Sequence, residues 1–163
     1  MKIIKRILLV LCGLFVLIQF IRPSKNSSEA GPTGQLTGRL SIPPDIHETF
    51  KVACYDCHSD YTRYPWYAEI QPVGWWLNDH IQDARRHLNF SQFASYNARR
   101  QYLKFEQIAS EVDEEGMPLP SYLILHHDAK LSREQIARIV AWSHSMIDTM
   151  RAIYPPDSLA RKK

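Results

Sequence analysis

The sequence predicts an all-α domain, and three observations lead to that prediction. Apolar residues recur at intervals of three and four along several stretches, which is the spacing of one face of an α-helix. Helix-capping and helix-stop signals stand at the ends of these stretches. No segment shows sustained two-residue alternation with turn pairs, so we expect no β-sheet. The 163 residues, 45% of them hydrophobic, suit one compact domain with shorter segments at its ends.

Four helices are expected in this domain. Proline is favoured in the first turn of a helix, a Ser-x-x-Gln capping box marks a helix start, and glycine often follows a helix end. These signals are Pro43-Pro44-Asp45 for the start of the first helix, Pro72 for the second, the stretch from about Tyr96 to Gly116 for the third, and Ser132 with Gln135 for the fourth.

An apolar run precedes the domain. Residues 7–21 (ILLVLCGLFVLIQFI) contain one strongly polar residue, Gln19, and follow three basic residues. Fifteen helical residues cover roughly 22 Å, so crossing a hydrocarbon core of about 30 Å requires a helix over residues 3–21. The flank after Gln19 offers no small-x-small cleavage site. We therefore expect residues 1–22 to be an uncleaved, single-pass membrane anchor, with a cleaved signal peptide as the alternative.

The orientation of this anchor and the remaining boundaries follow from composition. The basic residues ahead of the apolar run place the domain on the periplasmic or outer side of the membrane. Residues 23–44, rich in Ser, Gly, Pro and Thr, are expected to form a flexible linker. The folded domain is expected over residues 45–154 and a basic tail over 155–163. Cys12 follows Leu11 inside the apolar run and is interpreted as a buried membrane cysteine, not a lipidated one.

Charge is distributed unevenly along the chain. The net charge is +3, but nine of the 20 Lys and Arg residues lie in the first 39 and last three positions. Residues 45–157 carry the other 11 basic residues against 16 Asp and Glu, a net charge of −5. No basic patch interleaved with aromatic residues is present in the sequence, so we expect no nucleic-acid partner.

The strongest functional signal is the string Cys54-Tyr55-Asp56-Cys57-His58. Two thiols three positions apart project from nearly one side of a helical turn, so both can add to the vinyl groups on one edge of a porphyrin. The imidazole that follows then reaches the iron. The string predicts one covalent c-type haem, attached through Cys54 and Cys57, with His58 as an iron ligand.

The string has three other possible interpretations. A zinc site needs two further ligands, and no second pair stands at finger spacing, although His126 and His127 are adjacent. A thioredoxin-like redox pair needs a βαβ context, which the pattern does not suggest. A structural disulfide leaves His58 without a role.

The sequence also resembles a known family. The strings CYDCHS, TRYPWY, PVGWWLNDHI, HLNFS, GMPLPSY and LSREQIARIVAW are similar to those of small haem-binding domains in exported bacterial proteins, related in plan to monohaem cytochromes c. The resemblance spans about residues 45–150. It implies a cytochrome c-like helical domain with covalent haem at Cys54 and Cys57, and with His58 as the proximal ligand.

A sixth iron ligand opposite His58 is expected at Met117. This methionine lies between Gly116 and two nearby prolines, so its backbone is stiff and non-helical, as in the Gly-Met-Pro loop of cytochromes c. A loop methionine that fills a core gap is the structural alternative. Histidines are the competing ligands and would give a lower potential. They are His80, His87, His126 and His127.

Further residues are candidates for contact with the haem and its partners. Aromatic contacts are expected from Trp66, Tyr67 and Trp142, and propionate contacts from Arg63, Arg85 and Arg86. An acidic run before Met117 is expected to border the haem edge and to steer basic redox partner proteins. This run consists of Glu111, Asp113, Glu114 and Glu115.

These expectations favour a membrane-tethered monohaem electron carrier whose protein part tunes the cofactor. A haem-based gas or redox sensor, or a small peroxidase with a labile sixth ligand, is the alternative. A third possibility is a haem-bearing module of a larger complex. No acid–base pair or nucleophile arrangement stands out, so we do not expect an enzyme.

Overall fold

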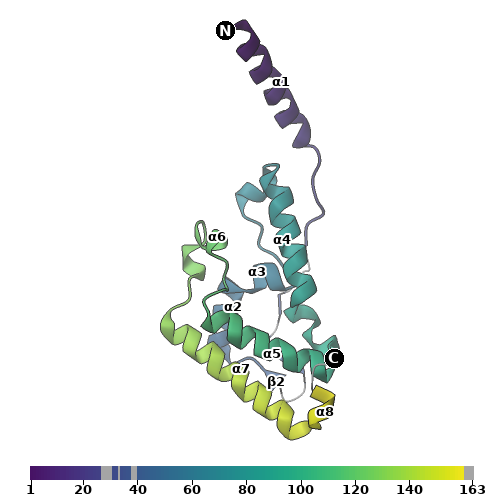
Figure 1. Cartoon of the computed structure of the whole chain (residues 1–163), viewed down its shortest axis with the longest axis vertical. Helices are drawn as coiled ribbons and strands as arrows, with labels where there is room; N and C mark the ends of the chain where they lie inside the picture. Colours follow the sequence, from purple (N-terminus) through teal and green to yellow (C-terminus); the bar gives the residue numbers. More distant parts are fainter. Residues whose placement is uncertain (27–30, 33, 38–39, 160–163) are drawn as a thin grey trace.

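The computed structural model describes residues 1–26, 31–32, 34–37 and 40–159. Most of this part is helical, which confirms the all-α prediction (Figure 1). The elements are α1 (Lys2–Ile18), β1 (Gln35–Thr37), β2 (Leu40–Ser41), α2 (Pro44–Ala53), α3 (Tyr55–His58), the 3₁₀ turn η1 (Trp66–Glu69), α4 (Val73–His87), η2 (Phe90–Ser95), α5 (Ala98–Asp113), α6 (Pro120–Leu123), η3 (His127–Ala129), α7 (Arg133–Ile153) and α8 (Pro156–Leu159).

The main core lies where α5 and α7 pack lengthwise against each other and against α2 and η2. Phe93, Phe105 and Met150 are completely buried in it. The rings of Phe105 and Trp142 meet edge to face at 5.5 Å. Burial of each large apolar side chain stabilises a fold by roughly 1.5–3 kcal/mol, so this layer holds the other elements in place. A second, smaller cluster forms under η1 and α4 from Ala68, Leu77 and Ile81.

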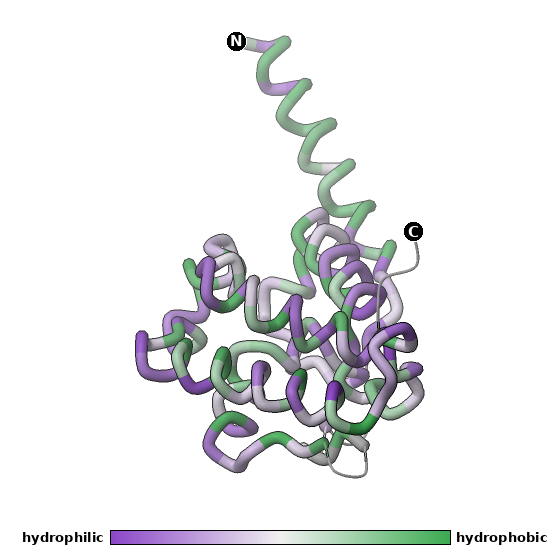
Figure 2. The backbone as a smooth tube through the Cα atoms, turned by 60° about the horizontal axis from the view of Figure 1, so that its bottom comes forward, coloured by the Kyte–Doolittle hydropathy of each residue, from purple (hydrophilic) through white to green (hydrophobic). Residues whose placement is uncertain are grey.

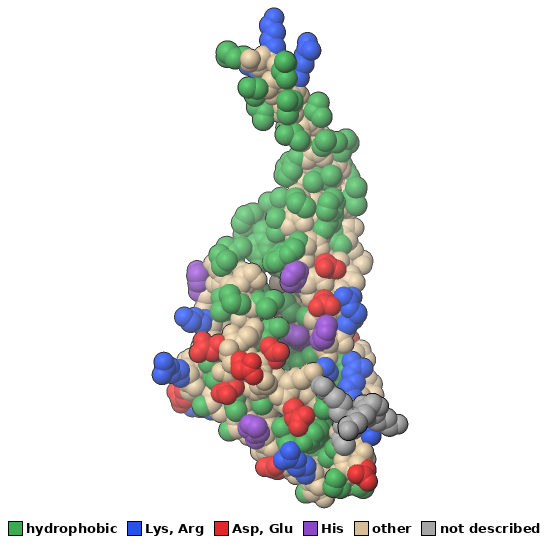
Figure 3. All heavy atoms as spheres, in the orientation of Figure 1, with side chains coloured by type: hydrophobic (Ala, Val, Ile, Leu, Met, Phe, Trp, Pro, Cys, Tyr) green, Lys and Arg blue, Asp and Glu red, His purple; other side chains and the backbone are tan. Residues whose placement is uncertain are grey.

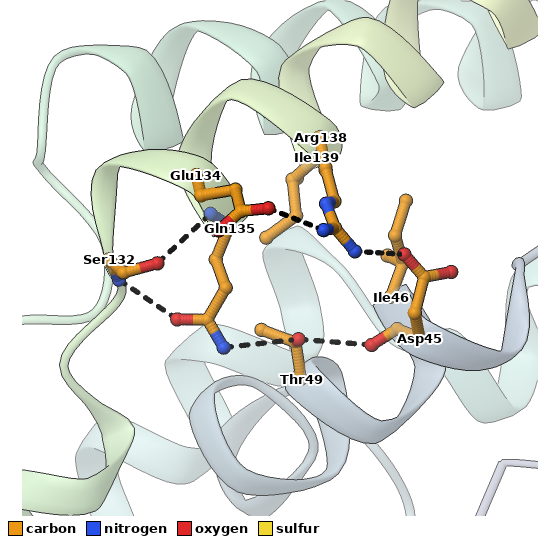
Figure 4. Close-up of a pocket in the computed structure, with 8 residues that line it drawn as sticks. All are labelled: Asp45, Ile46, Thr49, Ser132, Glu134, Gln135, Arg138 and Ile139. Atoms are coloured by element: carbon orange, nitrogen blue, oxygen red, sulfur yellow. Dashed lines mark hydrogen bonds and ion pairs between the residues drawn. The ribbon is translucent and has the colours of Figure 1, made fainter.

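Helix α7 starts with the predicted capping box. The backbone N–H of Gln135 donates to Ser132 Oγ at 3.2 Å, and the N–H of Ser132 donates to Gln135 Oε1 at 2.9 Å. From the same turn, Arg138 reaches Asp45 on α2 at 3.1 Å (Figure 4). The Gln135 amide also donates to Thr49 at 3.4 Å. These polar contacts fix α2 on α7 and so position the residues that follow α2.

The expectation that no sheet forms was wrong for a short hairpin. Strands β1 and β2 pair antiparallel within the stretch expected to be a flexible linker. Leu36, Leu40 and Ile42 are buried in the main core, and the indole N–H of Trp142 donates to the Ser41 carbonyl at 3.0 Å. Three well-placed apolar residues are therefore enough to bind this polar stretch to the domain. Residues 27–30, 33, 38 and 39 of the expected linker lie outside the described residues.

Helix α1 points away from the domain and is apolar beyond its first residues (Figures 1 and 2). It contains 17 residues, fewer than the expected span of residues 3–21, because the helix ends at Ile18 and the side chain of Gln19 bonds to the domain instead. No helix in the described part of the chain is both long and apolar enough to cross a membrane. The expected single-pass helix is therefore not found.

The C-terminal end of α5 also differs from the expectation. Helix α5 ends at Asp113, and Glu115 rather than Gly116 adopts the left-handed conformation, with φ of 55°. A Cβ at Gly116 would lie 2.8 Å from the Glu111 carboxylate, which is the flexible end of an exposed side chain and can move away. The N–H groups of Gly116 and Met117 both donate to the Glu111 carbonyl, at 2.9 and 3.1 Å. These two hydrogen bonds to one carbonyl fix the point at which Met117 leaves the helix.

The C-terminal stretch expected to be a basic tail begins with structure. Pro155 follows α7, and α8 then folds back so that Leu159 is buried in the main core. Residues 160–163 of the tail lie outside the described residues.

Candidate functional site

A cavity of about 320 Å³ lies between α4 and α5, within the range of cofactor sites (about 300–1,000 Å³). Figure 3 shows a hollow on this face of the molecule, with hydrophobic walls and histidines at its edge. The lining of the cavity contains five polar residues beside a larger set of apolar, sulfur and imidazole groups. The polar residues are Asp83, His87, Lys104, Gln107 and Glu111, and the others are Phe50, Cys54, His58, Leu88, Phe90, Ile108, Val112 and Met117.

The cysteine string forms a tight turn at the edge of this cavity. Cys54 breaks the helical path between α2 and α3, with φ of −128° and ψ of −44°. Its carbonyl accepts the N–H groups of Cys57 at 3.2 Å and His58 at 2.9 Å, which closes one helical turn. The Cys54 side chain packs on the main core and that of Cys57 on the second cluster. The turn therefore joins the two apolar clusters.

Both thiols of the string are free and protonated. Burial raises the pKa of Cys54 to about 12, and the nearby Cys57 adds to the effect. Burial also raises the pKa of Cys57 to about 11, with the Asp56 carboxylate as the second cause. Neutral thiols in apolar surroundings are inert toward metals and disulfides until a reactive partner is brought to them.

Asp56, in the middle of the string, holds the turn in place. It is buried and accepts three hydrogen bonds from Arg63: one from the backbone N–H at 3.0 Å and two from the guanidinium at 3.2 and 3.0 Å. Tyr122 of α6 adds a longer bond at 3.3 Å, and Thr62 donates to the Asp56 carbonyl at 2.7 Å. A buried carboxylate needs such partners, so the loop after the string is bound firmly to it.

His58 lines the cavity, and one of its ring nitrogens is hydrogen-bonded. Its Nδ1 lies 3.0 Å from the carbonyl oxygen of Leu88, and since a carbonyl can only accept, Nδ1 carries the hydrogen. Nε2 is then left with a lone pair. Burial lowers the pKa of His58, which favours the neutral ring. A neutral imidazole oriented through its second nitrogen is what a metal requires of a histidine ligand.

The structure brings Met117 into the cavity that Cys54 and His58 line. Of the four competing histidines only His87 lines it as well. His80 stacks on Trp76 with ring centroids 4.2 Å apart. The other two, His126 and His127, lie beyond α6, where His126 bonds to the Tyr67 hydroxyl at 2.8 Å and His127 is exposed.

Several side chains that were expected to contact the haem are paired with or packed on other residues. Trp142 is part of the main core, in edge-to-face contact with Phe50 and Phe105. Trp66 is 75% exposed at the far end of η1, and Tyr67 is bonded to His126. All three candidate arginines have carboxylate partners: Arg63 with Asp56, Arg85 with Asp60 and Arg86 with Asp83. Arg63 and Arg85 thus pair with residues outside their own helix or turn, and Arg86 pairs with a residue three positions earlier in α4.

Sequence reasoning missed the residues that form the cavity walls. Leu88 and Phe90 point into it because Leu88 and Asn89 are extended, so that alternate side chains share a face. The string HLNFS contained this alternation, but it was too short to stand out. Lys104 and Gln107, which also line the cavity, gave no signal because lysine and glutamine on a helix are normally solvated.

The acidic run extends from the cavity to the surface. Glu111 lines the cavity, and Asp113, Glu114 and Glu115 are exposed around the end of α5. Among the described residues, no three His, Cys, Asp or Glu side chains are placed together as a zinc site would require.

Comparison with known proteins gives one match. The sequence profile of a family described as "Haem-binding domain" matches residues 13–145, which include the cysteine string, the cavity and part of α1. No curated protein and no solved structure matches the chain.

Proposed function

Since this chain belongs to the haem-binding domain family and is a haem-binding protein, we propose that it holds one covalent haem c and carries single electrons at the outer face of a membrane. The observation that carries the proposal is that Met117, which is distant in the sequence from Cys54 and His58, lines the same cavity as they do. The haem supplies the redox chemistry, and the protein holds it, orders its ligands and limits its contact with water.

The cysteine turn supports covalent attachment. In thioether formation each thiol adds across a vinyl C=C bond: sulfur bonds to one carbon and the thiol hydrogen moves to the other, so no oxidant is needed. Cys54 and Cys57 are both reduced and belong to a single turn of backbone. Asp56 and Arg63 hold that turn, which favours a fixed position for the edge of the porphyrin.

Axial ligation by His58 and Met117 supports electron transfer. His58 is oriented by the Leu88 carbonyl, and Met117 leaves α5 at a point fixed by two hydrogen bonds to Glu111. A haem held by His58 and Met117 would supply electron-transfer chemistry without a protein-side substrate site at the iron, and a His/Met pair would give a higher potential than two histidines.

The cavity has polar side chains that suit the haem carboxylates. Lys104 and His87 line it from α5 and α4. With the three arginines paired elsewhere, Lys104 is the cation best placed to receive a propionate, which it would bind as a point charge.

Membrane attachment is supported by α1. Its side chains are exposed and mostly apolar, and the basic residues Lys2, Lys5 and Arg6 stand at its start. The acidic run around Glu114 supports a basic redox partner, because exposed charges of one sign steer the approach of the opposite sign.

A haem sensor or small peroxidase is the second candidate. One observation favours it: Met117 is only partly buried and belongs to a loop, not to a packed helix. A methionine held in this way can be displaced by a gas or a peroxide.

An absorption spectrum of the haem-loaded protein, with Met117→Ala and Met146→Ala for comparison, tests the proposal. Met146 is a partly buried methionine packed on the main core, so its loss is a matched control. We expect a weak near-infrared sulfur-to-iron band in the wild type and in Met146→Ala, and its loss in Met117→Ala. Absence of the band in the wild type, together with ready binding of carbon monoxide, would reject the electron carrier and favour the sensor or peroxidase.

A further inference from the structure

The place where α1 meets the domain has an exposed apolar surface that the haem chemistry does not use. Trp66 is 75% exposed and Trp76 is 51% exposed there. Figure 3 shows hydrophobic side chains gathered over the end of α4 nearest to α1, with most charged side chains farther along the domain. We refer to this area as the junction surface. It consists of Phe20, Ile21, Trp66, Ile70, Val73 and Trp76.

The C-terminal end of helix α1 and the residues after it are bonded directly to the domain. The Gln19 amide makes two hydrogen bonds to the backbone of Gln71: it accepts from the N–H at 2.8 Å and donates to the carbonyl at 3.1 Å. The indole N–H of Trp75 donates to the Ile21 carbonyl at 2.7 Å. Arg22 then pairs with Glu69 of η1 at 3.0 Å. These contacts set the direction in which α1 leaves the domain.

The segment after α6 extends the junction surface. His126 lies against η1, because it accepts or donates a 2.8 Å bond with the Tyr67 hydroxyl. The two residues before it, Ile124 and Leu125, are 67% and 62% exposed. Apolar side chains from two distant parts of the sequence therefore face solvent at the same end of the molecule.

We propose that the junction surface rests on the lipid bilayer to which the apolar helix α1 attaches the chain, at the boundary between headgroups and acyl chains. This inference rests on the proposed membrane attachment. Tryptophan prefers that boundary, where its ring is buried and its N–H stays near water. The carboxylate at the junction, Glu69, is paired with both Arg22 and Lys25, so docking brings no unpaired carboxylate to the membrane surface. Because α1 is exposed around its whole circumference, a bilayer can surround it, whereas a protein partner would have to enclose it.

Docking in this way places the cavity at a defined height. Helix α4 starts at Val73, in the junction surface, and the cavity is lined by Asp83 and His87 near its other end. At about 1.5 Å per residue these two lie roughly 15 and 21 Å along the helix from Val73. The cavity is thereby kept in the aqueous phase, within reach of a water-soluble redox partner.

Carbene labelling from a water-soluble diazirine tests the inference on the full-length, haem-loaded chain in phosphatidylcholine vesicles. Mass spectrometry measures the labelling of each exposed side chain with and without vesicles. We expect vesicles to reduce labelling several-fold at Trp66, Trp76 and Ile124. Labelling at Ile153 and Tyr154, which are 47% and 38% exposed at the end of α7, should stay unchanged.

The outcomes separate this inference from the proposed attachment. If the protein does not float with vesicles, attachment and docking are both wrong. If it floats but Trp66 and Trp76 are labelled as without vesicles, α1 attaches the chain and the docked orientation is wrong. Protection without vesicles that grows with protein concentration would show that a second copy covers the surface, which also overturns the inference. The double variant Trp66→Asp, Trp76→Asp should still float with vesicles, but Ile124 should no longer be protected from labelling. The control variant Ile153→Asp should float and keep Ile124 protected.

Discussion

The ring of His58 is anchored through the backbone of Leu88, whose carbonyl lies 3.0 Å from Nδ1. The anchor is a backbone atom of an extended segment between α4 and η2, so its position depends on what holds that segment. Asn89 does so: its side chain is buried, donates to Asp60 at 2.7 Å and accepts from the N–H of Ser91 at 3.0 Å. The orientation of His58, the expected iron ligand, thus depends on Asn89, the residue next to the Leu88 carbonyl that contacts its ring.

Asn89→Ala should therefore change the haem as well as the stability. Loss of its buried hydrogen bonds should cost about 1–3 kcal/mol in the free energy of unfolding. A looser Leu88 carbonyl should also weaken the basicity of His58 and shift the reduction potential. Thermal unfolding and a redox titration measure the two effects. Asn97→Ala is the control, because Asn97 caps α5 at 2.9 Å without touching this segment. It should cost about 1 kcal/mol and leave the potential unchanged; equal shifts in both variants would contradict the proposed role of Leu88.

Replacement of the two cysteines should release the haem. With Cys54→Ala and Cys57→Ala together, acidified acetone should extract all of the haem, whereas the wild type should retain it on the chain. Each single variant should retain haem through the remaining thioether. Cys12→Ala is the matched control, because Cys12 is a free, exposed cysteine on α1, remote from the cavity. Retention of haem by the double variant would disprove covalent attachment at this turn.

Removal of the Lys104 charge should lower the reduction potential. In the described part of the chain Lys104 bonds to Gln107 at 2.6 Å and has no carboxylate partner. A cation near the haem disfavours the oxidised, more positive iron, so Lys104→Gln should make reduction harder by roughly 1 kcal/mol. Lys130→Gln changes an exposed lysine beyond the cavity and should leave the potential unchanged in the same redox titration. If the reduction potential is unchanged in both variants, Lys104 does not bind a haem propionate.

The acidic run should make electron transfer sensitive to salt. With a basic cytochrome as the test partner, the second-order rate constant should fall as ionic strength rises. Glu114→Gln with Glu115→Gln should lower the rate at low salt by several-fold and flatten the dependence. Asp148→Asn, which removes an exposed carboxylate on α7, is the control and should have little effect. Stopped-flow traces that show no salt dependence in the wild type would reject steering by this run.

Local patterns in the sequence were enough to predict most helices. The capping box at Ser132 and the helix start after Pro72 depend on residues within one turn, so they could be read without knowing the fold. The cysteine string and Met117 were also found from short strings. That they line a common cavity follows from the packing of α5 beside α4, which no short string describes.

Features that depend on distant partners could not be predicted. The burial of Leu36 and Leu40 requires the core built by α5 and α7, which come much later in the sequence. The sequence suggests Arg63 as a propionate ligand, but in the fold the loop places its guanidinium on Asp56. The reading of the polar stretch before α2 failed for the same reason, because composition measures the average character of a segment and not the few side chains that pack.

The turn that holds Cys54 and Cys57 lies between the main core and the second cluster. Before the cofactor is attached, the cavity beside this turn has apolar walls that water can reach. Afterwards, a rigid ring joined to the turn would fill that space. Maturation and resistance to proteolysis are therefore linked: copies that have not received haem should be digested first, and the cell gains a means of removing them.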